Sequence, residues 1–397
     1  MELPVVCNIE ELRNALCEQK EFDISLYEFG FEDESNTINL RHDMGLGHAS
    51  VWVPTFARAL ERTQAPIQSL KLVGNCIEYK EALVLARALE RTQTPLQHLD
   101  LSINRIGDDG ARALARALEK TQTPLQSLDL SHNEIGVEGA RSLARALEIT
   151  QIPLQRLDLF DNCIKDQGGT ALAQALERTQ TPLQILILSN NVIGYPGARA
   201  IAQALKRTQT PLQSLHLSNN VIGDPAAQAL AQALEKTQTT LLQSLKLSGN
   251  MITEEGARAL AQALERTQTP LQSLDLTNNQ TGDKVADALA HALGQTQTPL
   301  QSLSVSRNGI TDRGAQALAE ALERTQTPLR NLDLSRNRIG VGGARSLVRA
   351  LEQTQAPLQY LDLSGNVIRD ELLQSIQNAL KTTQNNIGHV SVKRADM

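Results

Sequence analysis

The chain has few residues of the kinds that build cross-linked or metal-bound sites. Its 397 residues include four cysteines and one tryptophan, and aromatic residues make up only 3%. The cysteines (Cys7, Cys17, Cys76 and Cys163) follow neither a disulfide framework nor the spacing of a zinc site. We therefore expect a reducing compartment, the cytosol, rather than a secreted disulfide-rich scaffold.

Long apolar runs and clusters of positive charge are also missing. No segment approaches the roughly 20 apolar residues of a membrane span, and residues 1–7 do not read as a signal peptide. The formal net charge of −6 is spread along the chain, whereas nucleic-acid binding needs clustered Lys and Arg. We expect neither a membrane nor a nucleic acid as partner.

Motifs that carry chemistry are absent as well. The sequence contains no glycine-rich phosphate loop, no HExxH and no GxSxG. His42 and His48 lack a third metal ligand at a suitable spacing, and Cys163 has no neighbouring base that would make it a nucleophile. The sequence predicts a protein that is not an enzyme and that needs no cofactor and no metal.

The chain does contain one sequence motif, residues 123–136, that recurs with small changes along most of its length. An asparagine closes each copy: Asn75, Asn104, Asn133, Asn162, Asn191, Asn220, Asn250, Asn279, Asn308, Asn337 and Asn366. Successive asparagines are 29 residues apart, apart from one step of 30. Eleven copies at a fixed period predict a solenoid of stacked repeats.

Residues 125–153 show what one repeat encodes. Leucines alternate with polar residues, as in a half-buried strand: Leu125, Leu128 and Leu130. Asn133 ends the strand, and we expect stacked asparagines to form a ladder of hydrogen bonds. A helix follows, with Ala140, Leu143, Ala144 and Leu147 on one face.

Stacking such units sets strands about 4.8 Å apart and helices about 8–10 Å apart. This mismatch bends the stack. The predicted fold class is therefore α/β, a leucine-rich-repeat solenoid (horseshoe) with a concave parallel β-sheet and convex α-helices.

The pattern LxxLxLxxNxIxxxGAxxLAxAL in residues 125–147 resembles the ribonuclease-inhibitor-like leucine-rich repeats, and the resemblance covers about residues 67–392. Such repeats occur in ribonuclease inhibitor, innate-immune receptors, Ran GTPase activators and effectors of intracellular bacterial pathogens. The units here are unusually alike, which suggests recent tandem duplication and favours an effector or an expanded family.

The period divides the chain into three parts. Residues 1–66 are expected to form an N-terminal cap with a degenerate repeat at 38–43 and a helix from about Pro54 to Arg62. Residues 67–369 hold the eleven repeats. Residues 370–397 are expected to form a C-terminal capping helix, over 370–380, and an edge strand at 390–392.

A binding site on the concave face would appear as departures from the repeat. The densest group lies in the fourth to sixth repeats: Arg156, Phe160, Asp161, Ile185, Ile187, Tyr195 and His216. Exposed apolar residues beside an arginine are typical of an interface centre. Neutral variation is the alternative explanation.

A second candidate is a column of carboxylates: Asp100, Asp129 and Asp158 occupy the same position in three consecutive strands. It predicts either an acidic groove for a basic partner or simply a residue that is common in this repeat class.

These features predict a monomeric, non-catalytic protein–protein interaction module that binds a protein partner on its concave strand face. If the chain is a secreted effector, the partner is a host protein and the compartment is the host cytosol. The alternative is a small-GTPase regulator resembling the leucine-rich Ran GTPase activators, although the acidic tail usual in that family is not present.

Overall fold

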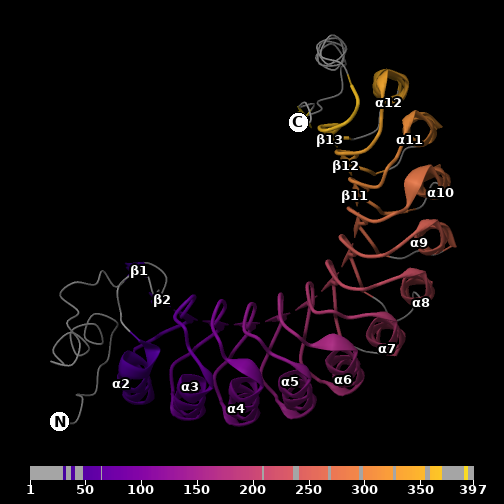
Figure 1. The fold of residues 1–397 in the computed structure, drawn as a ribbon. Helices are drawn as coiled ribbons and strands as arrows, with labels where there is room; N and C mark the ends of the chain where they lie inside the picture. Colours follow the sequence, from indigo (N-terminus) through magenta and orange to yellow (C-terminus); the bar gives the residue numbers. More distant parts are fainter. Residues whose placement is uncertain are drawn as a thin grey trace. The chain divides into compact units, whose positions relative to one another are not determined.

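Each repeat within residues 69–353 folds as a three-residue strand, a turn and a helix (Figure 1). The computed structural model describes residues 30–32, 37–40, 48–63, 65–207, 210–235, 241–266, 270–294, 298–324, 328–353, 358–368 and 389–391. The chain divides into two units, the first made of Met1–Val192 and Thr208–Leu212, the second of Ile193–Arg207 and Gln213–Met397. Strands line one side of each unit and helices the other (Figure 1).

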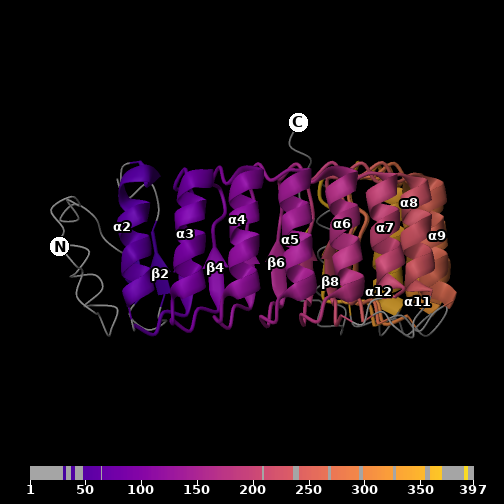
Figure 2. The same ribbon diagram turned by 90° about the horizontal axis from the view of Figure 1, so that it is seen from below.

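The described elements of the first unit are β1 (Gly30–Glu32), β2 (Thr37–Asn39), α2 (Ala49–Arg62), β3 (Ser69–Lys71), α3 (Tyr79–Arg91), β4 (His98–Asp100), α4 (Gly107–Lys120), β5 (Ser127–Asp129), α5 (Val137–Ile149), β6 (Arg156–Asp158), α6 (Lys165–Arg178) and β7 (Ile185–Ile187). Strands β2 to β7 pair in parallel and in sequence order, whereas β1 pairs antiparallel to β2. Helices α2 to α6 lie side by side as one layer (Figure 2).

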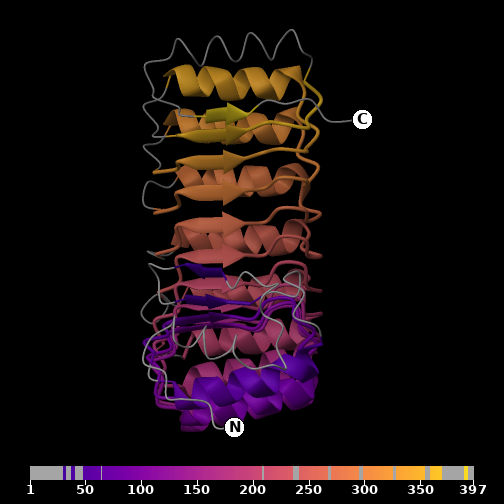
Figure 3. The same ribbon diagram turned by 90° about the vertical axis from the view of Figure 1, so that its left-hand side faces the viewer.

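The second unit repeats this plan with α7 (Tyr195–Leu205), β8 (Ser214–His216), α8 (Asp224–Leu234), β9 (Ser244–Lys246), α9 (Glu254–Arg266), β10 (Ser273–Asp275), α10 (Gly282–Gly294), β11 (Ser302–Ser304), α11 (Asp312–Arg324), β12 (Asn331–Asp333), α12 (Val341–Gln353), β13 (Tyr360–Asp362) and β14 (His389–Ser391). Its strands β8 to β14 are all parallel and stack one above another, with the helices behind them (Figure 3).

The α/β leucine-rich-repeat solenoid predicted from the period is confirmed within each unit. The alternating leucines of the strands and the alanine–leucine face of the helices form the core; Leu128, Leu130 and Leu147, for example, are at most 3% exposed. Alanine at the helix–helix contacts keeps neighbouring helices close enough to stack on strands about 4.8 Å apart.

The buried asparagines connect each repeat to the next, as the sequence predicts. The Asn162 side-chain amide donates to the Leu130 carbonyl of the preceding repeat (3.0 Å) and to the Leu159 carbonyl of its own (3.2 Å). Its Oδ1 accepts from the Asn133 and Ile135 amides of the preceding repeat, at 3.1 and 2.8 Å. One buried side chain therefore satisfies backbone groups in two coils.

Three further inter-repeat hydrogen bonds explain residues that recur in the loops. The Asp108 carboxylate of one repeat accepts from the Gly136 and Gly139 amides at the start of α5, at 2.7 and 2.8 Å. A Cβ on Gly139 would lie 2.8 Å from that carboxylate, so glycine is needed there. The Thr121 hydroxyl donates to the Leu89 carbonyl near the end of the preceding helix (2.9 Å), which satisfies a terminal acceptor.

The N-terminal region differs from the expectation in one respect. Helix α2 begins at Ala49, five residues before Pro54, because a proline near a helix start removes only one hydrogen bond there. The degenerate repeat is visible as β2, which pairs with β3. The expected capping helix over 370–380, His42, Cys7 and Cys17 lie outside the described residues.

Among the described helices, none has both the length and the apolar character that crossing a bilayer requires.

Asn162→Ala should lower the free energy of unfolding by about 3 kcal/mol, because it leaves two buried amides of the preceding repeat without an acceptor. Urea unfolding followed by circular dichroism measures this. Arg145→Ala, on the exposed face of α5, is the control and should change stability by less than about 0.5 kcal/mol. Equal effects of the two substitutions would contradict the role of the ladder.

Candidate protein-binding surface

The predicted aspartate column is present in the first unit. Asp100, Asp129 and Asp158 end β4, β5 and β6 and are in register with one another. Each carboxylate accepts the backbone amide two residues further on: Ser102 (3.0 Å), Ser131 (2.9 Å) and Phe160 (3.0 Å), respectively. Asp275, Asp333 and Asp362 do the same in the second unit. The aspartate therefore has a local role in the turn, which accounts for its recurrence.

A groove of about 470 Å³ nevertheless lies over the strands at the N-terminal end of this column. Its lining includes Lys71 and His98 as well as Asp100 and Asp129. Lys71 is in register with Asp100, so a basic residue lies next to the first of the three aspartates. The groove is open, and it carries charged side chains of both signs.

Asp158 has the most perturbed environment of the column. It is 6% exposed, and burial, followed by the neighbouring charge of Asp129, raises its pKa above the usual 3.8. The Phe160 amide and the Arg156 guanidinium oppose this rise in pKa. Arg156 Nη2 lies 2.8 Å from Asp158 Oδ2 on the same strand, so this arginine is already engaged within the chain.

Phe160 belongs to a contact network on the turns that follow β5, β6 and β7. Its half-buried ring meets the His132 ring edge to face, with centroids 4.9 Å apart. His132 Nδ1 in turn contacts Asp161 Oδ2 at 2.5 Å, and the Asn190 side-chain amide donates to Asp161 Oδ1. His132 was not among the predicted site residues. It precedes the ladder asparagine of its repeat, as Asp161 does in the next repeat, and this shared position is a signal in the sequence.

The sequence predicts that Ile185 and Ile187 on β7 form part of an exposed apolar patch, and the structure contradicts this for Ile187. Ile185 is half-buried and in register with Arg156. Ile187 is 7% exposed, so the expectation that it adds to an exposed patch is wrong. It stands in register with Asp158, which is also buried, because side chains on strands about 4.8 Å apart cover one another.

The two remaining predicted residues belong to the second unit. Tyr195 begins α7, is 43% exposed and lies under the Arg199 guanidinium, 5.9 Å from its ring centroid. His216 ends β8, and its Nε2 lies 2.9 Å from the Ser214 hydroxyl. Arg156, Phe160, Asp161 and Ile185 of the first unit lie on β6, on β7 and on the turn that follows β6, and we call these four residues the strip. Tyr195 and His216 are not assigned to it.

In the part of the chain that the structure describes, no three His, Cys, Asp or Glu side chains converge as metal ligands would. Cys76 and Cys163, the two described cysteines, are free and exposed.

Comparison with known proteins gives a clear match at the family level. The leucine-rich repeat model matches nine segments, which together make up more than half of the chain: 92–115, 121–144, 151–173, 179–202, 208–231, 239–261, 296–319, 325–348 and 355–376. No curated protein matches the chain.

Two of the solved structures that resemble the chain share low sequence identity with it. An internalin of Listeria monocytogenes is 16% identical with a TM-score of 0.49, over 98% of this chain and 94% of the internalin. A structure described as actin-binding site 2 of leiomodin-1 is 20% identical with a TM-score of 0.34, over 40% of this chain and 87% of its own.

Asp158→Asn tests the environment of this carboxylate. Because the pKa of Asp158 is raised in the folded protein, the folded state holds the proton more tightly than the unfolded chain. The resulting stabilisation is complete below the unfolded pKa and is lost as the pH rises through the raised pKa. The free energy of unfolding of wild type minus that of Asp158→Asn should therefore fall as the pH is raised from about 3 to about 7. Urea unfolding at both pH values measures it; a rise in this difference would contradict the assignment.

Proposed function

The chain belongs to the leucine-rich repeat family, and from that premise we propose that it is a non-catalytic protein–protein interaction module. The partner binds the strand face of the first unit, over the strip of Arg156, Phe160, Asp161 and Ile185 and the neighbouring acidic groove. The observation that carries the proposal is the contrast between this strip and its repeat equivalents, where serine stands at most of the positions that correspond to Phe160 and Ile185. A half-buried phenylalanine and isoleucine beside an arginine have the composition of an interface centre.

The acidic column supports a partner with basic character. Asp100 and Asp129 line the groove, and no described side chain forms an ion pair with either carboxylate. The local role of these aspartates explains why they recur, but it leaves one carboxylate oxygen free to attract positive charge.

The finer parts of the proposal rest on helix length, repeat similarity and composition. Helices of 11 to 14 residues in the repeats favour the ribonuclease-inhibitor-like subclass. The near identity of the repeats supports a secreted effector of an intracellular pathogen, which would bind a host protein in the host cytosol. The scarcity of cysteine supports a reducing compartment, and monomeric action is part of the proposal.

Affinity capture from eukaryotic cell lysate, read by mass spectrometry, tests the proposal. Phe160→Ala with Ile185→Asp should reduce capture of the partner at least about tenfold, since loss of central interface residues costs about 2 kcal/mol or more. Arg116→Ala with Arg145→Ala, on exposed helix positions of the same unit, is the matched control and should capture normally.

Equal capture by the two variants would contradict the proposed surface. If the purified chain instead accelerates GTP hydrolysis by a small GTPase, the alternative of a GTPase regulator would replace the proposal.

A further inference from the structure

A ladder of ion pairs runs along the helix ends of the first unit, and it has one break. The last cation of a helix reaches back to a glutamate of the preceding helix: Arg91 to Glu61 (3.5 Å), Lys120 to Glu90 (3.4 Å) and Arg178 to Glu148 (3.5 Å). The three glutamate side chains are only 25–26% exposed. Each of these partly buried carboxylates therefore has a counter-charge from the next repeat.

Helix α5 ends in Ile149, where its neighbours end in Arg or Lys. By the same spacing, a cation in place of Ile149 would be the partner of Glu119. Glu119 is half-buried, and no described side chain pairs with it, because its neighbour Lys120 reaches Glu90 instead. Ile149 is 54% exposed. The break thus leaves an uncompensated carboxylate beside an exposed apolar side chain.

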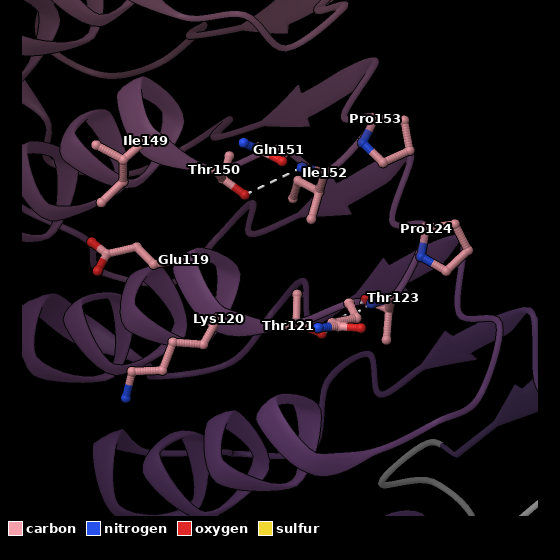
Figure 4. Close-up of a pocket in the computed structure, with 11 residues that line it drawn as sticks. Glu119, Lys120, Thr121, Thr123, Pro124, Ile149, Thr150, Gln151, Ile152 and Pro153 are labelled. Atoms are coloured by element: carbon pink, nitrogen blue, oxygen red, sulfur yellow. Dashed lines mark hydrogen bonds between the residues drawn. The ribbon is translucent and has the colours of Figure 1, made fainter.

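A pocket lies at this break in the ladder of ion pairs. A pocket of about 560 Å³ lies between the loops that leave α4 and α5, and both Glu119 and Ile149 line it (Figure 4). Pro124 and Pro153 form its side nearest the strands. The hydroxyl of Thr150 in the lining already donates to the Leu118 carbonyl (2.7 Å). Lys120 also lines the pocket, but its ammonium pairs with Glu90. The Glu119 carboxylate and the apolar surface of Ile149 remain for a ligand, beside the exposed Gln122 and Gln151.

We propose that this pocket binds an arginine or lysine side chain of a protein partner. The aliphatic part of the side chain lies on Ile149, and its charged end pairs with Glu119, in the place that a cation of the chain itself occupies in the neighbouring repeats. Arginine and lysine combine an apolar stem with a charged end, which is the combination that Ile149 and Glu119 present. Pro153, in the lining, lies three residues before Arg156, the first residue of β6.

The inference rests on the proposed role in protein recognition, since it names the chemistry of one anchor of the partner. It does not depend on Phe160 or Ile185, because none of its lining residues belongs to that strip.

The test uses the full chain labelled with ¹³C in the isoleucine δ1 methyl groups, titrated with the capped peptide Ac-Leu-Arg-Leu-NH₂. The Ile149 methyl signal should shift and saturate, with a dissociation constant on the order of millimolar. The peptide with citrulline in place of arginine, which keeps the shape and removes the charge, should bind about two- to fivefold more weakly, the range expected for a solvent-exposed ion pair.

Variants test whether the Glu119 carboxylate is the charge that pairs with the arginine of the peptide. Glu119→Gln should weaken arginine-peptide binding by the same factor, whereas Glu90→Gln, the equivalent residue in the preceding repeat, should leave it unchanged. Ile149→Arg restores the ladder within the chain and should abolish the shift at the nearby Ile152 methyl. Circular dichroism confirms that each variant is folded.

An unmoved Ile149 signal, equal affinity for the citrulline peptide, or equal effects of Glu119→Gln and Glu90→Gln would each overturn the inference. The titration needs no cellular partner, so its failure is distinguishable from failed capture by the strand face.

Discussion

The structure depends on the fact that no repeat can satisfy its own buried backbone. The amides of Asn133 and Ile135 have their acceptor in Asn162 of the next repeat, and the start of α5 has its acceptor in Asp108 of the preceding one. An unpaired buried amide costs about 1–3 kcal/mol, so residues at these positions are not free to change. This explains why asparagine, glycine and threonine recur at fixed places in the loops.

The same constraint leaves other positions free. Apolar side chains at the helix ends and on the strand face, such as Ile149 and Ile185, have no hydrogen-bonding group, so substitutions there leave the inter-repeat hydrogen bonds intact. In the first unit the departures gather on α5, β6, β7 and the adjoining turns: Ile149, Arg156, Phe160, Asp161 and Ile185. This concentration in adjacent repeats is the observation behind the proposed binding surface.

Much of the fold was predictable from the sequence because the repeat presents the same local pattern many times. The strands, the helices and the asparagine ladder follow from the spacing of Leu, Ala and Asn. The environment of the candidate site was less predictable. The burial of Ile187, the raised pKa of Asp158 and the contact of His132 with Asp161 depend on how neighbouring coils cover one another. Ile149 did have a signal, since Ile-Thr-Gln-Ile-Pro replaces the recurring Arg-Thr-Gln-Thr-Pro, but its meaning required the ion pairs seen in the structure.

The most direct test of the central claim, that departures from the repeat form the functional surface, is to revert them. A variant with Ile149→Arg, Phe160→Ser and Ile185→Ser carries residues that the neighbouring repeats already hold at these positions. The account predicts that this variant unfolds at the same or a higher urea concentration than wild type and no longer captures the partner from lysate. Undiminished capture by the reverted, folded chain would contradict it.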